Sequence, residues 1–77
     1  MSAYVIWVIA FDEAEATRWA SERGLAPGTW RYAHNADELK LAIKGDRFSY
    51  VGRYQQRPDY FPLAGVVRDK KMDWWRS

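Results

Sequence analysis

The chain has no cysteine, a single histidine, only three prolines and no apolar run as long as a membrane span. The lack of cysteine excludes disulfide bonds, thiolate zinc sites and a cysteine nucleophile, and His34 alone does not make a histidine cluster. The longest hydrophobic stretch, residues 4–11, is far shorter than the roughly 20 residues that cross a bilayer, and no basic segment precedes it. We therefore expect a cytoplasmic protein with no membrane anchor, metal or other cofactor.

Positive charge is concentrated in the second half of the chain. Residues 1–43 carry four Lys/Arg against six Asp/Glu, whereas residues 44–77 carry eight against four. A basic half favours an anionic partner, but this balance falls short of the basic stripe of a dedicated nucleic-acid binder and also fits an ordinary solvated surface. With 77 residues the chain is long enough for one domain, residues 1–77. Its five tryptophans are expected to supply much of the buried area.

Three segments have the composition of strands. Residues 4–10 form an unbroken run of β-branched and aromatic side chains, as expected for a central strand buried on both faces. Residues 29–33 alternate large rings with smaller or polar side chains, which is typical of a short strand near a sheet edge. Residues 48–54 form the third predicted strand, in which Gly52 marks either a bulge or a close backbone approach.

Helices are predicted after each of these strands. Asp12 caps a helix over residues 13–23, with Glu15 reaching back to its start and Gly24 ending it. Asn35 caps a second, short helix whose apolar face is Leu39, Ala42 and Ile43, ending at Gly45. The apolar positions 63, 66, 67 and 74 lie on one helical stripe, which predicts a terminal helix over residues 62–75 with the cations at 70, 71 and 76 near its end.

Strands separated by helices pair in parallel through right-handed crossovers. The most hydrophobic strand belongs in the middle, so we predict an α/β fold with a three-stranded, mainly parallel sheet in the order 2-1-3, β-α-β-α-β-α topology and helices on both faces. This arrangement is half of a Rossmann-like sheet. Ligands of such sheets bind beyond the carboxyl ends of the strands. That edge gathers polar side chains here: Asp12, His34, Asn35, Arg53, Gln55, Gln56 and Arg57.

No catalytic signature is found among these residues. A phosphate loop is disfavoured because the first strand-to-helix turn has no glycine and carries two carboxylates, Asp12 and Glu13. Those carboxylates can hold magnesium, although a helix cap explains Asp12 without a metal. His34 with Asn35 or Asp12 is the one acid-base candidate, because histidine titrates near neutrality. We expect the protein not to be an enzyme.

Two surfaces are candidates for binding. Arg53, Arg57, Tyr54 and His34 mix cations with rings and suit an anion or single-stranded nucleic acid, although the same residues can instead seal the sheet edge. The second surface is the end of the chain, with its paired tryptophans and nearby cations: Lys71, Met72, Trp74 and Trp75. One helix face cannot bury adjacent tryptophans equally, so at least one ring is expected to be exposed for a protein partner or for self-association.

Four segments carry a resemblance to a known group of proteins: residues 7–10 (WVIA), 19–25 (WASERGL), 27–32 (PGTWRY) and 36–39 (ADEL). Together they resemble small uncharacterised α/β proteins encoded by bacteriophages of actinobacteria. The resemblance covers roughly residues 4–54, and the stretch 41–45 (LAIKG) departs from the leucine-glycine pair that often follows the second helix in that group. It implies a phage accessory protein in the host cytoplasm and supplies no catalytic residues.

The leading functional prediction is therefore a non-enzymatic interaction module that binds and modulates a protein partner, with a host protein as the expected partner. Capped helices and patterned strands account for most residues, which leaves an aromatic and basic surface rather than a reactive centre. The alternative is a nucleic-acid or nucleotide-binding protein that uses the basic-aromatic edge. A homo-oligomer is a further expectation for a core this small.

Overall fold

The sheet is parallel and has four strands in the order β2-β1-β3-β4. In the computed structural model, which describes residues 4–75, β1 (Ile6–Ile9) pairs with both β2 (Trp30–Tyr32) and β3 (Arg47–Tyr50). The predicted parallel order 2-1-3 is confirmed. The prediction of three strands is wrong, because β4 (Asp73–Trp74) pairs in parallel with β3 and becomes the edge of the sheet.

The central position of β1 follows from its composition. Trp7 and Ile9 point to one side of the sheet and Val8 and Ala10 to the other, and all four are at most 1% exposed. Because the strand is buried on both faces, neither face can tolerate a polar side chain, and the sequence shows no alternation there. The two faces consequently belong to two separate hydrophobic clusters.

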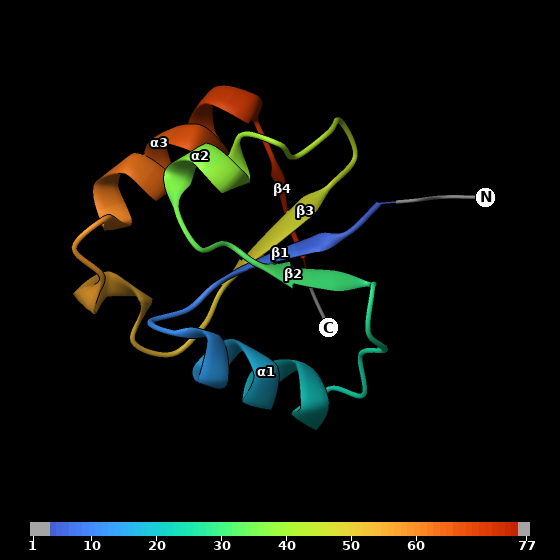
Figure 1. Ribbon diagram of the computed structural model, residues 1–77. Coiled ribbons are helices and arrows are strands. Elements are labelled where there is room, and N and C mark those ends of the chain that lie inside the picture. Colours follow the sequence, from blue (N-terminus) through green and yellow to red (C-terminus); the bar gives the residue numbers. More distant parts are fainter. Residues whose placement is uncertain (1–3, 76–77) are drawn as a thin grey trace.

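Three helices cover these faces (Figure 1). α1 (Glu13–Glu22) packs alone on one side through Ala16, Trp19 and Ala20. α2 (Ala36–Leu39) and α3 (Tyr60–Lys70) lie together on the other side, over Trp7 and Ile9. A short 3-10 helix, η1 (Tyr54–Gln56), follows β3. The prediction of helices on both faces is confirmed.

The first two helices begin where the capping residues indicate. The Asp12 side chain accepts a hydrogen bond from the Glu15 N–H at 2.8 Å, and Asn35 accepts one from the Glu38 N–H at 2.7 Å. α2 is shorter than its apolar pattern suggests, because regular helix ends at Leu39 and turns continue to Ala42. Ile43, which the sequence placed on the apolar face, is 57% exposed.

The last segment differs most from the prediction. The helix α3 begins at Tyr60 and ends at Lys70, so the predicted continuation to residue 75 is wrong. Lys71 adopts the left-handed conformation, with φ 52°, and the Met72 N–H then bonds back to the Val67 carbonyl. This closure is the one that a glycine usually makes at a helix end. It reverses the chain into β4; residue 76, the last of the predicted cations, lies outside the described residues.

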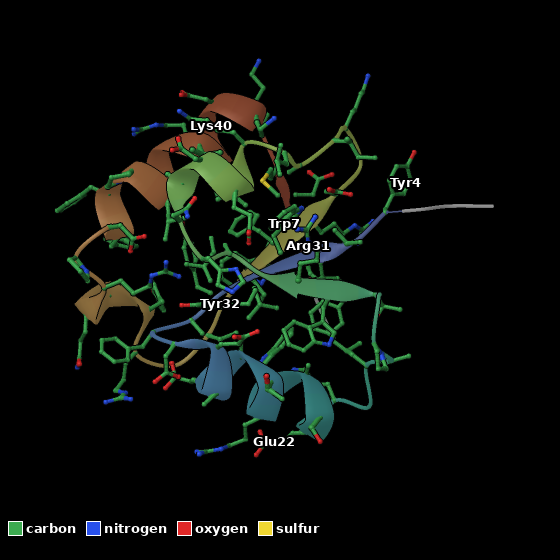
Figure 2. All side chains as sticks on the ribbon, viewed as in Figure 1. Tyr4, Trp7, Glu22, Arg31, Tyr32 and Lys40 are labelled. Atoms are coloured by element: carbon green, nitrogen blue, oxygen red, sulfur yellow. The ribbon has the colours of Figure 1, made fainter. Side chains whose placement is uncertain are left out.

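A buried carboxylate fixes the edge of the sheet where the strands begin. Asp46 is 5% exposed and accepts hydrogen bonds from the N–H groups of Val5 and Ile43 and from the indole Nε1–H of Trp7, at 2.9 to 3.1 Å. Figure 2 places Trp7 between the sheet and the α2/α3 layer. Asp46 therefore joins β1, the loop before β3 and the largest core side chain.

Candidate functional site

The carboxyl edge of the sheet, where a ligand was expected, is closed by Arg57. This side chain is only 5% exposed. Its guanidinium donates to the carbonyls of Ala10 and Ala33 at 3.0 and 2.8 Å, to the carbonyl of His34 at 2.9 Å, and through a fork to both oxygens of Asp59. An arginine has five N–H donors, and these five bonds use all of them. Arg57 thus ties the ends of β1 and β2 to the segment before α3.

Arg53 and Glu15 close a second part of the same edge. Glu15 accepts hydrogen bonds from the Phe11 N–H at 3.1 Å and the Arg53 N–H at 3.0 Å, and its other oxygen lies 3.4 Å from Arg53 Nε. The Arg53 guanidinium stacks over the Phe11 ring at 4.7 Å. Gly52 has φ 58°, and a Cβ atom there would collide with the Glu15 carboxylate, which confirms the predicted close approach. β3 itself stops at Tyr50, before the predicted residue 54.

His34 lies on the outer side of this edge and pairs with carboxylates. Its Nδ1 is 2.7 Å from Glu38 Oε1, and its Nε2 is 3.9 Å from Glu13 Oε1. These partners differ from the Asn35 or Asp12 expected for an acid-base pair. The hydrogen bond from His34 is the main cause that lowers the pKa of Glu38 below its ordinary value. The arrangement joins the starts of α1 and α2.

The four residues of the predicted anion site therefore do not form one site. Arg57 is internal and fully used, Arg53 is held by Glu15, and His34 is held by Glu38. Tyr54 lies elsewhere, stacked on Tyr50 with ring centroids 4.5 Å apart. Of the two interpretations that the sequence allowed for these residues, sealing of the sheet edge fits the geometry better.

Glu15→Gln is expected to make the protein less sensitive to acid. Burial raises the pKa of Glu15, but hydrogen bonds from the backbone N–H groups of Phe11 and Arg53, together with the Arg53 guanidinium, outweigh it, so the net pKa is lowered. A carboxyl with a lowered pKa in the folded state stabilises the fold above its unfolded pKa, and this contribution is lost as pH falls through the folded value. Urea midpoints at about pH 7 and about pH 3 measure the difference.

The wild-type midpoint should fall more steeply with acid than that of Glu15→Gln. The matched control is Glu22→Gln, on the outer side of α1 (Figure 2), which should retain the wild-type slope. Equal slopes for all three proteins would contradict the assigned role of Glu15.

The surface that remains is a set of six contacting rings, which we call the aromatic row: Phe48, Tyr50, Tyr54, Tyr60, Phe61 and Trp74. It extends from the edge strand β4 across β3 to η1 and the start of α3. The centroids of contacting rings are 4.5 to 6.2 Å apart, within the range of favourable aromatic pairs. The inner rings are buried or half-buried, whereas Trp74 is 47% and Phe61 82% exposed at the two ends.

The predicted partner surface at the chain end is divided between two faces of the sheet. Trp74 lies opposite Phe48 in the strand register and joins the aromatic row. Trp75 donates its N–H to the Phe48 carbonyl and turns its ring to the other face, against Trp19 at 5.3 Å. The expectation that adjacent tryptophans are not buried equally holds, although they are on a strand rather than a helix.

Of the other two predicted partner residues, only one is exposed. Met72 is half-buried against the α2/α3 cluster, whereas Lys71 is exposed at the end of α3. The contact of the tyrosines and Phe61 with the ring of Trp74 was not predicted from the sequence. The alternation of Phe48 and Tyr50 was a usable signal, but their contact with Trp74 depends on β4, which was not predicted.

Within residues 4–75 no group of three or more histidine, aspartate or glutamate side chains could hold a metal ion. No helix in that range is long and apolar enough to cross a membrane. Comparisons of the chain with protein-family models, with curated proteins and with solved structures found no match. The resemblance to phage proteins therefore stays a prediction.

Proposed function

We propose that this chain is a non-enzymatic interaction module that binds another protein through the aromatic row. The observation that supports the proposal is the exposure of Trp74 and Phe61 at the ends of a packed set of rings. Large aromatic side chains dominate the energetics of protein interfaces, tryptophan above all. We extend the proposal to a host-encoded partner that is modulated in the cytoplasm, as the resemblance to phage accessory proteins implies.

The inner rings Phe48 and Tyr50 restrict Trp74 before any partner binds, whereas Phe61 contacts Tyr60 alone among the six rings of the row. Tyr50 contacts four other rings of the row, including Tyr54 in a stacked pair and Trp74 at 5.5 Å. Burial, followed by the neighbouring tyrosines, raises the pKa of Tyr50, as expected for a hydroxyl away from bulk water. Side chains already restricted in the free protein lose little entropy on binding. The row is therefore a preorganised apolar surface.

The carboxyl edge of the sheet supports the same proposal because its usual ligand position is already filled by a side chain of the protein. In open α/β sheets that edge is the usual ligand site, which is what the Rossmann-like interpretation of the sheet predicts. Here Arg57 occupies it with five internal hydrogen bonds. We therefore keep the Rossmann-like assignment as a proposal about architecture and place binding on the aromatic row.

The test is affinity capture from an actinobacterial lysate with three forms of the protein. The double variant Phe61→Ala/Trp74→Ala removes both exposed ends of the row, and Leu41→Ala removes a side chain that is 64% exposed outside it. A captured protein is then purified and titrated directly. The double variant should weaken binding by about a hundredfold, the size expected when two interface anchors are truncated, and Leu41→Ala by less than about twofold.

A nuclease-treated arm separates the alternative function. Stacked rings also bind single-stranded nucleic acid, with an affinity that falls steeply as salt rises. A ligand that is lost on nuclease treatment, or direct binding of labelled single-stranded DNA with that salt dependence, would replace the proposal by the nucleic-acid alternative. A protein partner held equally by wild type and the double variant would refute the role of the row.

A further inference from the structure

A pocket with a volume of about 540 Å³ opens at the opposite, amino edge of the sheet. Its lining residues come from the loop that leads from α2 into β3 and from the turn that leads from α3 into β4. Pockets that bind small molecules have volumes of roughly 300 to 1,000 Å³ and are mostly apolar with a few placed polar groups. Ala42, Ile43 and Met72 supply the apolar part of this lining.

The acceptors around the pocket are mostly used inside the protein. The oxygens of Asp46 accept from Val5, Trp7 and Ile43. In the last turn of α3 the carbonyls of Val67 and Arg68 accept from the N–H groups of Met72 and Lys71. The Ala42 carbonyl accepts from Lys70 Nζ at 2.9 Å. The Lys70–Ala42 bond joins the two walls of the pocket, and the rim is left to other groups.

Two lysines at the rim of the pocket have no such internal hydrogen bonds to the part of the chain that the structure describes. Lys44 and Lys71 are exposed, and within residues 4–75 neither has an ion pair or a side-chain hydrogen bond. The left-handed conformation of Lys71 turns the chain at the mouth of the pocket. The carboxylate of Asp73 also lies at the rim and partly offsets the positive charge of these lysines. In total, three lysines and two aspartates line the pocket. The unsatisfied groups are therefore mainly ammonium donors above an apolar floor.

We propose that the amino-edge pocket binds a small amphipathic anion, with its apolar body against Ala42, Ile43 and Met72 and its charged head between Lys44 and Lys71. The chemistry common to such ligands is a carboxylate, sulfonate or phosphate on a hydrophobic body. The site is separate from the aromatic row and does not depend on the function proposed for it. Asp73 limits the affinity by repelling the anionic head.

Anilinonaphthalene sulfonate is a probe with this chemistry, and phenylnaphthylamine provides the same rings without the charge. Fluorescence titration should show one sulfonate site, and Lys44→Gln/Lys71→Gln should raise its Kd by about tenfold, within the range for two exposed charge pairs. Asp73→Asn should lower that Kd by about twofold. Neither change should alter the Kd of phenylnaphthylamine, because both act on the charged head.

Amide NMR shifts on adding the sulfonate should be largest at Ile43, Lys44 and Met72. The Phe61→Ala/Trp74→Ala variant should bind the sulfonate as the wild type does. Unchanged sulfonate binding in the double lysine variant would overturn the proposal, as would an equal change for both dyes. Loss of the site in the Phe61→Ala/Trp74→Ala variant would place the dye on the aromatic row and refute the pocket assignment, without bearing on partner capture.

Discussion

Arg57→Ala is expected to leave about half or more of the protein unfolded at room temperature. The substitution leaves three carbonyls, those of Ala10, Ala33 and His34, without a donor at the closed edge, and Asp59 without its partner. Each buried acceptor left without its donor costs about 1–3 kcal/mol, so the three carbonyls together account for about 3 kcal/mol or more. A domain below about 80 residues seldom has more than about 3–5 kcal/mol of net stability. The stability lost in Arg57→Ala is therefore about as large as the total net stability of the domain.

Circular dichroism during urea and thermal unfolding measures this effect. The matched control is Arg68→Ala, an exposed arginine of α3, which should change stability by less than about 0.5 kcal/mol. Arg57→Lys keeps the charge but has three donors in place of the five-donor fork, so it should also be clearly destabilised. Wild-type stability in Arg57→Lys would show that charge alone, and not the fork, holds the edge.

Asp46→Ala should have the second largest effect, about 3 kcal/mol or more. It removes the acceptor for three donors at once, and an unsatisfied buried donor costs about 1–3 kcal/mol. Asp46→Asn is the sharper substitution, because an amide has one oxygen. That oxygen can serve either Val5 on one side or Trp7 and Ile43 on the other, so we expect an intermediate loss of about 2 kcal/mol.

A double-mutant cycle with Trp7→Phe isolates the indole hydrogen bond. Trp7→Phe alone removes both the donor and part of a core side chain, so it is destabilising by itself. If the bond contributes as described, Asp46→Asn should cost less in the Trp7→Phe background than in the wild type. Asp69→Ala, an exposed acid on α3, serves as the control. Strict additivity of the two substitutions would contradict the contact.

The features that the sequence predicted correctly depend on local patterns. The buried strand at residues 6–9, the cap at Asp12 and the cap at Asn35 are each determined within a few residues of the chain. The parallel order of the first three strands follows from those elements and from the handedness of crossovers. This part of the fold was therefore accessible without coordinates.

The end of the chain was mispredicted because its helix stop has no sequence signal. A lysine occupies the left-handed position at residue 71, where glycine is usual, and Trp74 falls by chance on the helical stripe of Leu63 and Val67. Once the helix was extended through residue 75, the two-residue strand β4 had no place. Trp74 was then expected on a helix surface instead of in the aromatic row.

Arg57 shows why the candidate site could only be predicted in part. The local sequence around an arginine in an irregular segment near an aromatic residue is the same whether the side chain binds an external anion or seals the edge of the sheet. The difference lies in three carbonyls that come from distant parts of the chain, at Ala10, Ala33 and His34. No local sequence pattern specifies that these three carbonyls come together around Arg57. The exposure of one of the two terminal tryptophans, in contrast, could be predicted because Trp74 and Trp75 are adjacent in the sequence.

The division of the tryptophans between layers also determines how the protein emits light. Trp7 is buried in the core with its indole N–H bonded to Asp46. Trp19 and Trp75 contact one another on the α1 face, where Trp30 is half-buried, and Trp74 is the most exposed of the five. Intrinsic fluorescence is consequently a sum of distinct components. An aqueous quencher reaches the exposed ring of Trp74 first and reduces its red-shifted emission. The fluorescence of this ring can therefore report when a partner covers the aromatic row.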